Sequence, residues 1–406
     1  MKKLIVVAVA ALFATSAIAG DMKWGGSSAW RYTDGKYDDG LNNNDANSKS
    51  HSVQKHRQHA VRANFGATGG WKNVEWGVGL RTTGSANSDY VAFANGSTDT
   101  ALGFDQAWMR YVTGTSFGDF GFTFGRQMNV FAYDMTTQNF FDNDTRFDGF
   151  GFSWNWGSFG FNMAEYFFQG YNRGTAGTAS YTYTDSTQAD NSSSSYFSKM
   201  HGFQPHFSWK FSDEIDTKFA FGYYMVDGDT NFTNSTAGAT ATINGFVTPS
   251  GTVAFQNGTV TMANPRWMQL YNSWKLPYKL GFSWEYVSNG RKPKFGTSAV
   301  EMNGKAYAAA LTYGSIKKAQ DWKVGFTYGK KDVGSVISNF SGGRWLPNNK
   351  GWVFNADYGL ADNFNIGFKT YRLKNVDNIN STTGQALSTA QSVKTTINEL
   401  VTSVSF

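Results

Sequence analysis

The sequence predicts an all-β fold, a transmembrane antiparallel β-barrel of about sixteen strands that spans residues 20–406 as a single domain. Three observations predict it. Apolar and polar residues alternate along many segments, and the connections between these segments are short and long in turn. Aromatic residues make up 17% of the chain, which contains no Cys. Strict alternation indicates strands, and no comparably long stretch has the 3.6-residue period of a helix.

The first residues have the features of a secretory signal peptide, which we assign to residues 1–19. A basic start at Lys2 and Lys3 precedes an apolar stretch over residues 4–13, and small residues at 15–19 form an A-x-A cleavage site. No later stretch approaches the roughly 18 consecutive apolar residues that a membrane-spanning helix needs. We therefore expect an exported chain that crosses a membrane with strands closed into a barrel.

Each alternating segment has one aromatic face and one face of small or polar residues. In one of them, Phe282, Trp284 and Tyr286 alternate with Ser283 and Glu285. Comparable segments occupy residues 74–81, 150–156, 203–211, 218–225, 322–328 and 364–369. A soluble β-sandwich would instead pair a polar outer face with an aliphatic inner one. Glycines and charges on the second face suit a water-filled lumen, so the barrel is the favoured interpretation.

Short and long connections predict which end of the barrel faces which side. The joins at 157–158, 212–214, 276–277 and 361–363 are tight. The long polar connections cover 34–54, 84–101, 127–147, 170–196, 227–263, 289–302, 332–349 and 375–393. This pattern is typical of bacterial outer-membrane barrels, with short periplasmic turns and long extracellular loops. The last strand ends on Phe406, on the same face as Leu400 and Val404.

The connection at 127–147 differs from the other long loops, which are Ser, Thr, Asn and Gly tracts. It is rich in apolar side chains: Met128, Val130, Phe131, Tyr133, Met135, Phe140 and Phe141. Such a loop needs a surface to pack against, and the wall of a wide barrel offers one. We therefore predict that this third long loop folds into the lumen and narrows it.

Charged residues predict how the narrowed lumen selects solutes. Three arginines lie on the polar faces of strands before the loop: Arg62, Arg81 and Arg110. Three carboxylates lie on the loop itself: Asp134, Asp142 and Asp144. Opposed charges across a narrow lumen create a transverse field that selects solutes by size and charge. These six residues are the predicted pore constriction, with a basic wall and an acidic loop.

An alternative reading makes the same charges ion pairs that tie the loop to the wall. For the basic wall both readings stay open. For the residues that flank the loop, the anchoring role is favoured: Arg126, Arg146 and Asp148.

Part of the chain resembles a known family. The segments Phe124–Gln127 and Phe141–Gly149, with Ala107–Tyr111 upstream, resemble the central region of the bacterial outer-membrane porins. The predicted strand count, the inward third loop and the terminal Phe406 are also similar to general porins. The resemblance implies a homotrimer in the bacterial outer membrane, and a C-terminal strand that the outer-membrane assembly machinery recognises through Phe406.

These observations predict a porin without enzymatic activity or cofactor, through which ions and small hydrophilic solutes diffuse passively. A substrate-selective channel is the alternative, and a structural or adhesive barrel is a third class. His206 and Ser208 share one strand face, as an outer-membrane phospholipase would require, but they face the lumen and no third group can be named.

The remaining signals add no metal or nucleic-acid partner to this prediction. Asp142 and Asp144 suggest a calcium loop, but Arg146 occupies a ligand position. The net charge of +6 is spread singly along the chain, which does not indicate nucleic-acid binding. The expected partners are the lipid bilayer with its lipopolysaccharide and the permeating solutes.

Overall fold

The computed structural model describes residues 22–38, 53–83, 91–92, 101–131, 146–169, 182–184, 197–227, 229–233, 260–263, 266–291, 294–295, 300–301, 303–332, 335–336, 345, 349–376 and 394–406. The predicted signal peptide lies outside these residues. Within them, no helix is long and apolar enough to cross a membrane.

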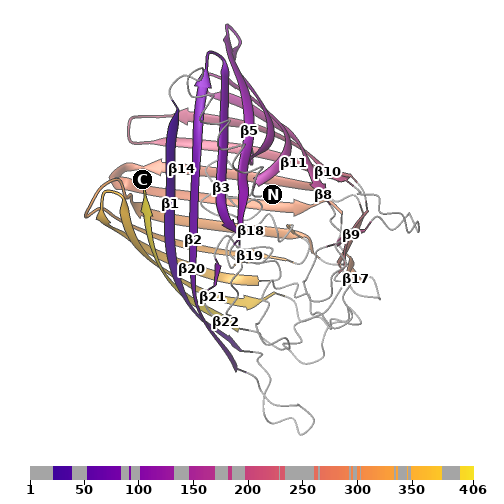
Figure 1. The fold of residues 1–406 in the computed structure, drawn as a ribbon. Helices are drawn as coiled ribbons and strands as arrows, with labels where there is room; N and C mark the ends of the chain where they lie inside the picture. Colours follow the sequence, from indigo (N-terminus) through magenta and orange to yellow (C-terminus); the bar gives the residue numbers. More distant parts are fainter. Residues whose placement is uncertain are drawn as a thin grey trace.

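Sixteen strands of the described chain close into one antiparallel ring, which confirms the predicted fold (Figure 1). In ring order they are β1 (Lys23–Asp38), β2 (Val53–Trp71), β3 (Val74–Thr83), β5 (Ala101–Thr115), β6 (Gly118–Met128), β7 (Arg146–Trp156), β8 (Phe159–Gln169), β10 (Phe197–Lys210), β11 (Asp216–Asp227), β14 (Arg266–Leu276), β15 (Leu280–Asn289), β18 (Lys305–Gly314), β19 (Trp322–Lys331), β20 (Asn349–Ala361), β21 (Phe364–Asn375) and β22 (Lys394–Ser405). These strands reach or exceed the roughly 9–11 residues that span a bilayer.

Shorter strands lie beside the ring. β4 (Val91–Ala92) pairs with β2. A separate antiparallel sheet contains β9 (Thr182–Thr184), β12 (Asp229–Thr233), β13 (Val260–Ala263), β16 (Lys294–Phe295) and β17 (Val300–Glu301). One 3-10 turn, η2 (Pro277–Lys279), connects β14 to β15.

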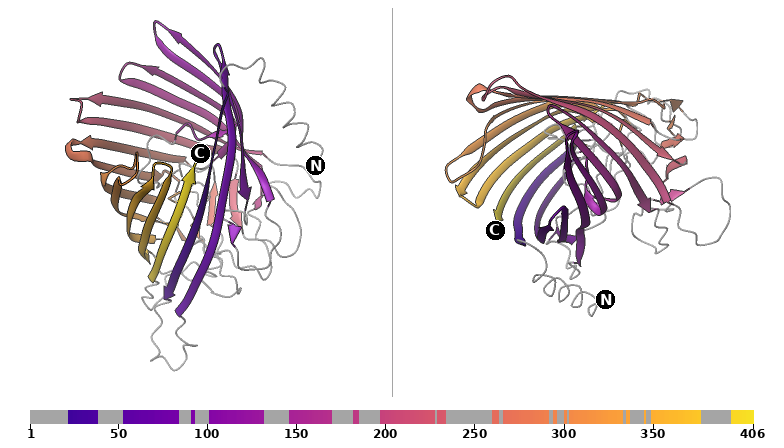
Figure 2. Two further views of the ribbon diagram at one scale, coloured as in Figure 1. Left: turned by 60° about the vertical axis from the view of Figure 1, so that its left-hand side comes forward. Right: turned by 90° about the horizontal axis from the view of Figure 1, so that it is seen from above.

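The ring closes where the last strand meets the first. β22 pairs with β1 from Ser27 opposite Ser405 to Asp38 opposite Lys394, and Figure 2 shows the yellow β22 beside the indigo β1. The predicted loop 34–54 begins later than expected, because β1 continues to Asp38 with a partner strand on each side. Those partners satisfy the backbone groups of a stretch whose side chains are polar.

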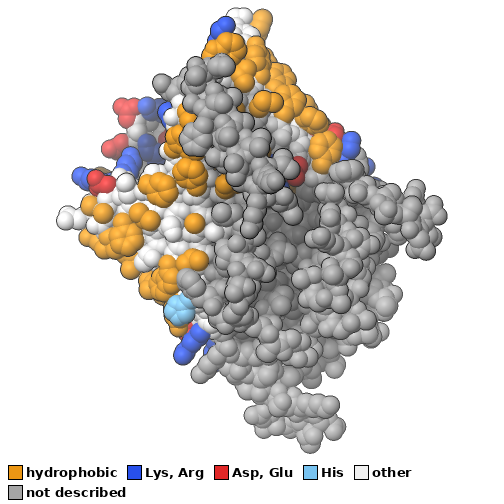
Figure 3. Space-filling view, viewed as in Figure 1, with side chains coloured by type: hydrophobic (Ala, Val, Ile, Leu, Met, Phe, Trp, Pro, Cys, Tyr) orange, Lys and Arg blue, Asp and Glu red, His pale blue; other side chains and the backbone are white. Residues whose placement is uncertain are grey.

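Aromatic side chains cover the outside of the ring. Exposed residues of this kind include Phe122 and Phe124 on β6, Phe221 on β11 and Phe326 on β19. Figure 3 shows hydrophobic side chains (orange) gathered over the outer surface of the strands. The inner face carries small and polar residues, among them buried Ala, Gln and Glu side chains on β10 to β18, together with buried aromatic residues such as Tyr166, Tyr224 and Trp267. Aromatic-out and polar-in alternation is the arrangement that a lipid-embedded, water-filled barrel needs.

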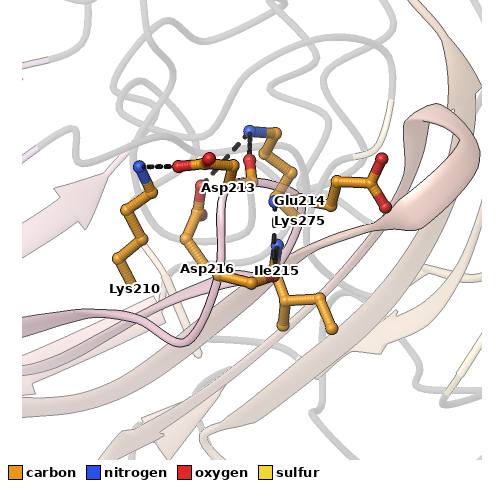
Figure 4. Close-up of polar contacts among 7 residues, drawn as sticks. Lys210, Asp213, Glu214, Ile215, Asp216 and Lys275 are labelled. Atoms are coloured by element: carbon orange, nitrogen blue, oxygen red, sulfur yellow. Dashed lines mark hydrogen bonds and ion pairs between the residues drawn. The ribbon is translucent and has the colours of Figure 1, made fainter.

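Short turns occupy one end of the ring, which we call the short-turn end; the long connections leave the other, the loop end. The turns lie at 72–73, 116–117, 157–158, 211–215, 277–279, 315–321 and 362–363. Figure 4 shows the turn between β10 and β11, where the Lys210 Nζ lies 2.6 Å from the Asp213 carboxylate. Lys275 of β14 reaches the Asp213 carbonyl at 3.2 Å and so ties a third strand to this turn.

Candidate functional site

The third long loop starts by folding into the lumen. Residues 129–131 leave β6 on the inner side, and the Phe131 side chain is fully buried. Its ring contacts the inward-facing Tyr166 and Tyr224, with centroid distances of 5.8 and 5.1 Å. Its carbonyl accepts a hydrogen bond from Gln204 Nε2 at 3.2 Å. The base of the loop is therefore held against the wall formed by β8, β10 and β11, in the direction that the sequence predicts.

A chain of buried hydrogen bonds supports this contact across five neighbouring strands. Asn162 of β8 donates to Gln204 of β10 at 3.2 Å, and Gln204 donates to the Tyr224 hydroxyl at 3.2 Å. Tyr224 donates to Gln269 of β14 at 2.5 Å, and Gln269 donates to Glu285 of β15 at 2.5 Å. Buried polar groups that are fully paired fix one arrangement of side chains. This chain of hydrogen bonds, which we call the polar ladder, therefore forms a rigid surface against which the base of the loop packs.

Arg81 of the predicted basic wall shares a carboxylate with Arg146. Its Nε lies 3.2 Å from Asp105 Oδ1, and the Arg146 Nη2 lies 3.3 Å from Asp105 Oδ2. Asp105 is the extra residue of a β-bulge in β5, opposite Gly79 and Leu80. A bulge re-aims a side chain, and here it turns Asp105 toward the lumen side of β3. Arg146 is the first residue of β7, so this contact links the end of the loop to the wall.

Arg110 also has a partner on its own wall. The Arg110 Nη1 lies 3.4 Å from Glu75 of β3, and its Nη2 donates to the Ser153 hydroxyl at 3.2 Å. Gly121 makes room for the guanidinium, since a Cβ there would lie 2.7 Å from Nη2. Arg110 is thus fixed against β3, β6 and β7 by neighbours on the wall.

Two further arginines extend the basic wall onto β1 and β2. Arg62 of β2 is half-buried on the same inner face. Arg31 of β1, which is not among the predicted constriction residues, lies 3.8 Å from Glu399 of β22. Together with Arg81 and Arg110, these arginines line four consecutive strands of the ring.

The acidic members of this wall were not predicted from the sequence. They are Glu75, Asp105 and Glu399. Alternation places Glu75 and Glu399 on the inner face, but their partners depend on strand register. For Asp105 the alternation is ambiguous, since counting from Phe104 places it inward and counting back from Met109 places it outward, and only the bulge in the structure resolves the direction.

Arg126 and Asp148, by contrast, lie on the outer face. They are directly paired residues of β6 and β7, with the Arg126 Nη1 3.7 Å from Asp148 Oδ2. Their face is that of the exposed Phe124 and Phe150. This contact joins the two strands to each other, and a role in anchoring the loop stays a prediction.

The acidic half of the predicted constriction cannot be placed, because Asp134, Asp142 and Asp144 lie outside the described residues. Among the residues that are described, no group of three or more His, Asp and Glu side chains could hold a metal ion. His206, one of the two residues of the phospholipase alternative, lies against Gly160 of β8 on the inner face. Ser208 shares that face two residues along β10.

A closed antiparallel ring with an aromatic outside and a charged inside defines a class, that of the membrane-spanning barrels with a polar interior. No family model and no characterised protein matches the sequence. Solved structures match over nearly the whole chain. Pseudomonas putida OprB matches with a TM-score of 0.54 and 10% identity, covering 97% of this chain and 96% of that chain.

Two other bacterial proteins give similar matches. A Salmonella typhi OmpF in complex with daunomycin has a TM-score of 0.48 and 9% identity, covering 95% of this chain and 97% of that one. A mutant of the Rh. blastica porin has a TM-score of 0.44 and 9% identity, covering 95% and 100%. At 10% identity the likeness to OprB concerns the fold alone, that of a closed antiparallel barrel.

Proposed function

We propose that this protein is a porin of the bacterial outer membrane, a water-filled channel through which ions and small hydrophilic solutes diffuse passively. One observation carries the proposal: a closed ring of sixteen strands presents aromatic side chains outward and paired charges inward. A lipid-facing surface and a hydrated lumen in the same sheet are the requirements of such a channel. The short-turn end would face the periplasm and the loop end the outside.

The constriction in this proposal lies between the basic wall and the third loop. Arg62, Arg81 and Arg110 supply the wall, and the polar ladder seats the loop base at Phe131. Because Arg81 and Arg110 already have carboxylate partners on the wall, the field across the pore depends on the three loop carboxylates: Asp134, Asp142 and Asp144. We propose that they face the wall and set the balance between cations and anions.

Conductance of the purified protein in a planar bilayer tests the channel. Large stepwise openings are expected, and a protein that never conducts would overturn the proposal. The reversal potential across a salt gradient then tests the constriction. Neutralising Asp134, Asp142 and Asp144 to Asn should shift it toward anion preference, whereas an unchanged value would remove the loop from the filter.

A substrate-selective channel is the second candidate, and the fixed wall favours it. Arg110 is held at three points by Glu75, Ser153 and the space over Gly121, and such a fixed guanidinium can bind a solute as well as repel one. Saturation of the conductance by one class of solute would support this candidate. A conductance that depends linearly on concentration for every solute tested would support general diffusion.

Assembly belongs to the same proposal. We propose a homotrimer, and recognition of Phe406 by the outer-membrane assembly machinery. Phe406 is well exposed on the outer face of the seam between β22 and β1, where a recognition partner could reach it. Crosslinking of the protein in native membranes tests the trimer, and a strictly monomeric species would contradict it.

A further inference from the structure

An apolar patch lies on the inner face of β20 to β22, toward the loop end. All of its members are buried: Val353, Tyr371, Leu373 and Ile397. Val353 is directly opposite Tyr371, and Tyr371 is directly opposite Ile397. Ile397 precedes the inward-facing Glu399 by two residues and so shares its face. Apolar side chains are stabilised by removal from water, so a patch that faces a hydrated lumen and is buried must be covered from the lumen side.

Trp345 covers this patch. It belongs to the connection between β19 and β20, for which the sequence predicts a polar loop, and its buried side chain packs in the same cluster. The indole Nε1 donates a hydrogen bond to the Asn349 carbonyl at 3.3 Å. A Trp that buries its ring and pairs its N–H has the environment of a core residue. The connection at 332–349 therefore enters the lumen at Trp345, and we call it the second inward loop.

A buried lysine holds the main chain of this loop at the same point. Lys331 is the last residue of β19 and is directly opposite Asn349, on the inner face that Val353 shares. Its side chain is only 1% exposed, and its Nζ donates a hydrogen bond to the Trp345 carbonyl at 2.8 Å. A buried ammonium group is costly unless its N–H groups are paired, so movement of this carbonyl is penalised. Both the ring and the backbone of Trp345 are therefore held against the wall.

The two inward loops pack on nearly opposite parts of the ring. In ring order, β8, β10 and β11, which carry the contacts of Phe131, are the seventh, eighth and ninth strands. β20, β21 and β22, which carry the patch under Trp345, are the fourteenth, fifteenth and sixteenth. The arginines of the basic wall lie on the first four strands, in the arc between these two packing sites. The lumen therefore has a loop base on each side of the arginines.

We propose that the passage is narrowed from two opposite sides, and that Trp345 is a specificity-determining residue that positions the second inward loop across the lumen from the third loop. The inference rests on the proposed channel function and goes beyond it, because the constriction described above contains a single loop. Pore diameter decides which solutes pass. In a passage bounded by two loops, both set its smallest dimension, so release of either loop raises the size limit.

Exclusion of polyethylene glycols of graded mass from the open channel in a planar bilayer tests the proposal. Trp345→Ala uncovers the patch and should admit larger polymers and raise the single-channel conductance about twofold. Trp345→Phe keeps a ring on the patch and should retain most of the size limit. The matched control is Trp352→Ala on the same strand region, because Trp352 stacks on the outward-facing Phe326 and lies away from the lumen. It should conduct like the wild type.

Lys331→Met removes the donor to the Trp345 carbonyl but leaves the indole in place, and it should raise the size limit in the same direction. This variant provides the test if Trp345→Ala does not fold, and conductance without polymer shows that each variant is folded. The double variant Phe131→Ala with Trp345→Ala should admit larger polymers than either single variant, because the two side chains fix different loops.

A double variant with the same size limit as Phe131→Ala would show that the third loop alone sets the limit and would overturn the inference. Equal limits in the wild type and in the Trp345→Ala and Lys331→Met variants would overturn it too, as would equal widening in the Trp352→Ala control. The two proposals fail separately. A wild-type protein that never conducts refutes the channel, whereas a conducting protein whose size limit is independent of Trp345 refutes only the second inward loop.

Discussion

Phe406 and Gly26 close the barrel by two backbone hydrogen bonds. The Gly26 amide donates to the Phe406 carbonyl at 3.0 Å, and the Phe406 amide donates to the Gly26 carbonyl at 3.1 Å. The Phe406 ring lies over Gly26, where a Cβ would be 2.7 Å from the ring and 2.6 Å from the Asn64 carbonyl oxygen. A glycine at this position thus allows the aromatic ring to cover the seam.

Gly26→Ala should weaken the seam by about 1–3 kcal/mol, because the added methyl group overpacks a site bounded by backbone and ring. The midpoint of urea unfolding in detergent measures the change. Gly25→Ala is the control, since a Cβ there meets only the Phe406 carbonyl at 3.4 Å. Equal midpoints for the two variants would show that the ring does not need Gly26.

Asp105→Asn should shift the ion preference of the channel toward anions. The change leaves Arg81 and Arg146 without their shared carboxylate and exposes their charge to permeating ions. The reversal potential across a salt gradient measures the shift. Asp148→Asn removes one negative charge from the outer face and should leave the reversal potential unchanged. If both variants shifted it equally, the effect would be one of net charge rather than of position.

Tyr224→Phe should loosen the third loop. The hydroxyl accepts a hydrogen bond from Gln204 and donates one to Gln269, so its removal leaves buried amide groups unpaired at about 1–3 kcal/mol. We expect a lower unfolding midpoint and larger fluctuations of the open-channel current. Tyr223→Phe, on the outer face of β11, is the matched control. Fluctuations of the open-channel current that are no larger in the Tyr224→Phe variant than in the wild type would mean that the polar ladder does not stabilise the position of the loop.

The turn between β18 and β19 should loosen in acid. The backbone amide of Lys317 donates a hydrogen bond to the Asp321 carboxylate, which lowers the pKa of that group, and the Lys318 amide lowers it further. A lowered pKa means that the ionised carboxylate stabilises the turn above the ordinary pKa of Asp. This stabilisation is lost as the pH falls through the lowered value.

Hydrogen exchange of the Lys317 and Lys318 amides checks this, with protection expected to fall as Asp321 is protonated. In Asp321→Asn, the change of protection over the same acidic range should disappear. Protection that stays constant with pH in the wild type would contradict the assignment.

The order of the ring could be predicted because its signal is local. Alternation in a segment such as 279–286 fixes which side chains face lipid, and tight joins such as 157–158 fix which strands are neighbours. The inward face of Arg62, Arg81 and Arg110 follows from the same alternation. The end of the first strand was harder to predict, because its side chains are polar. Pairing with β2 and with β22, which is distant in sequence, stabilises this end of β1.

The sequence by itself determined the barrel, its strand count, the lipid-facing surface and the inward start of the third loop. Only the tertiary structure decided which side chains interact across strands. It places Asp105 between Arg81 and Arg146, and it places the Tyr224 hydroxyl between Gln204 and Gln269. It also decided that Lys350 stands beside Lys374. The physical reason is register. A period of two is a property of consecutive residues, whereas cross-strand neighbours depend on how far each strand slides along the next and on single inserted residues such as the bulge at Asp105.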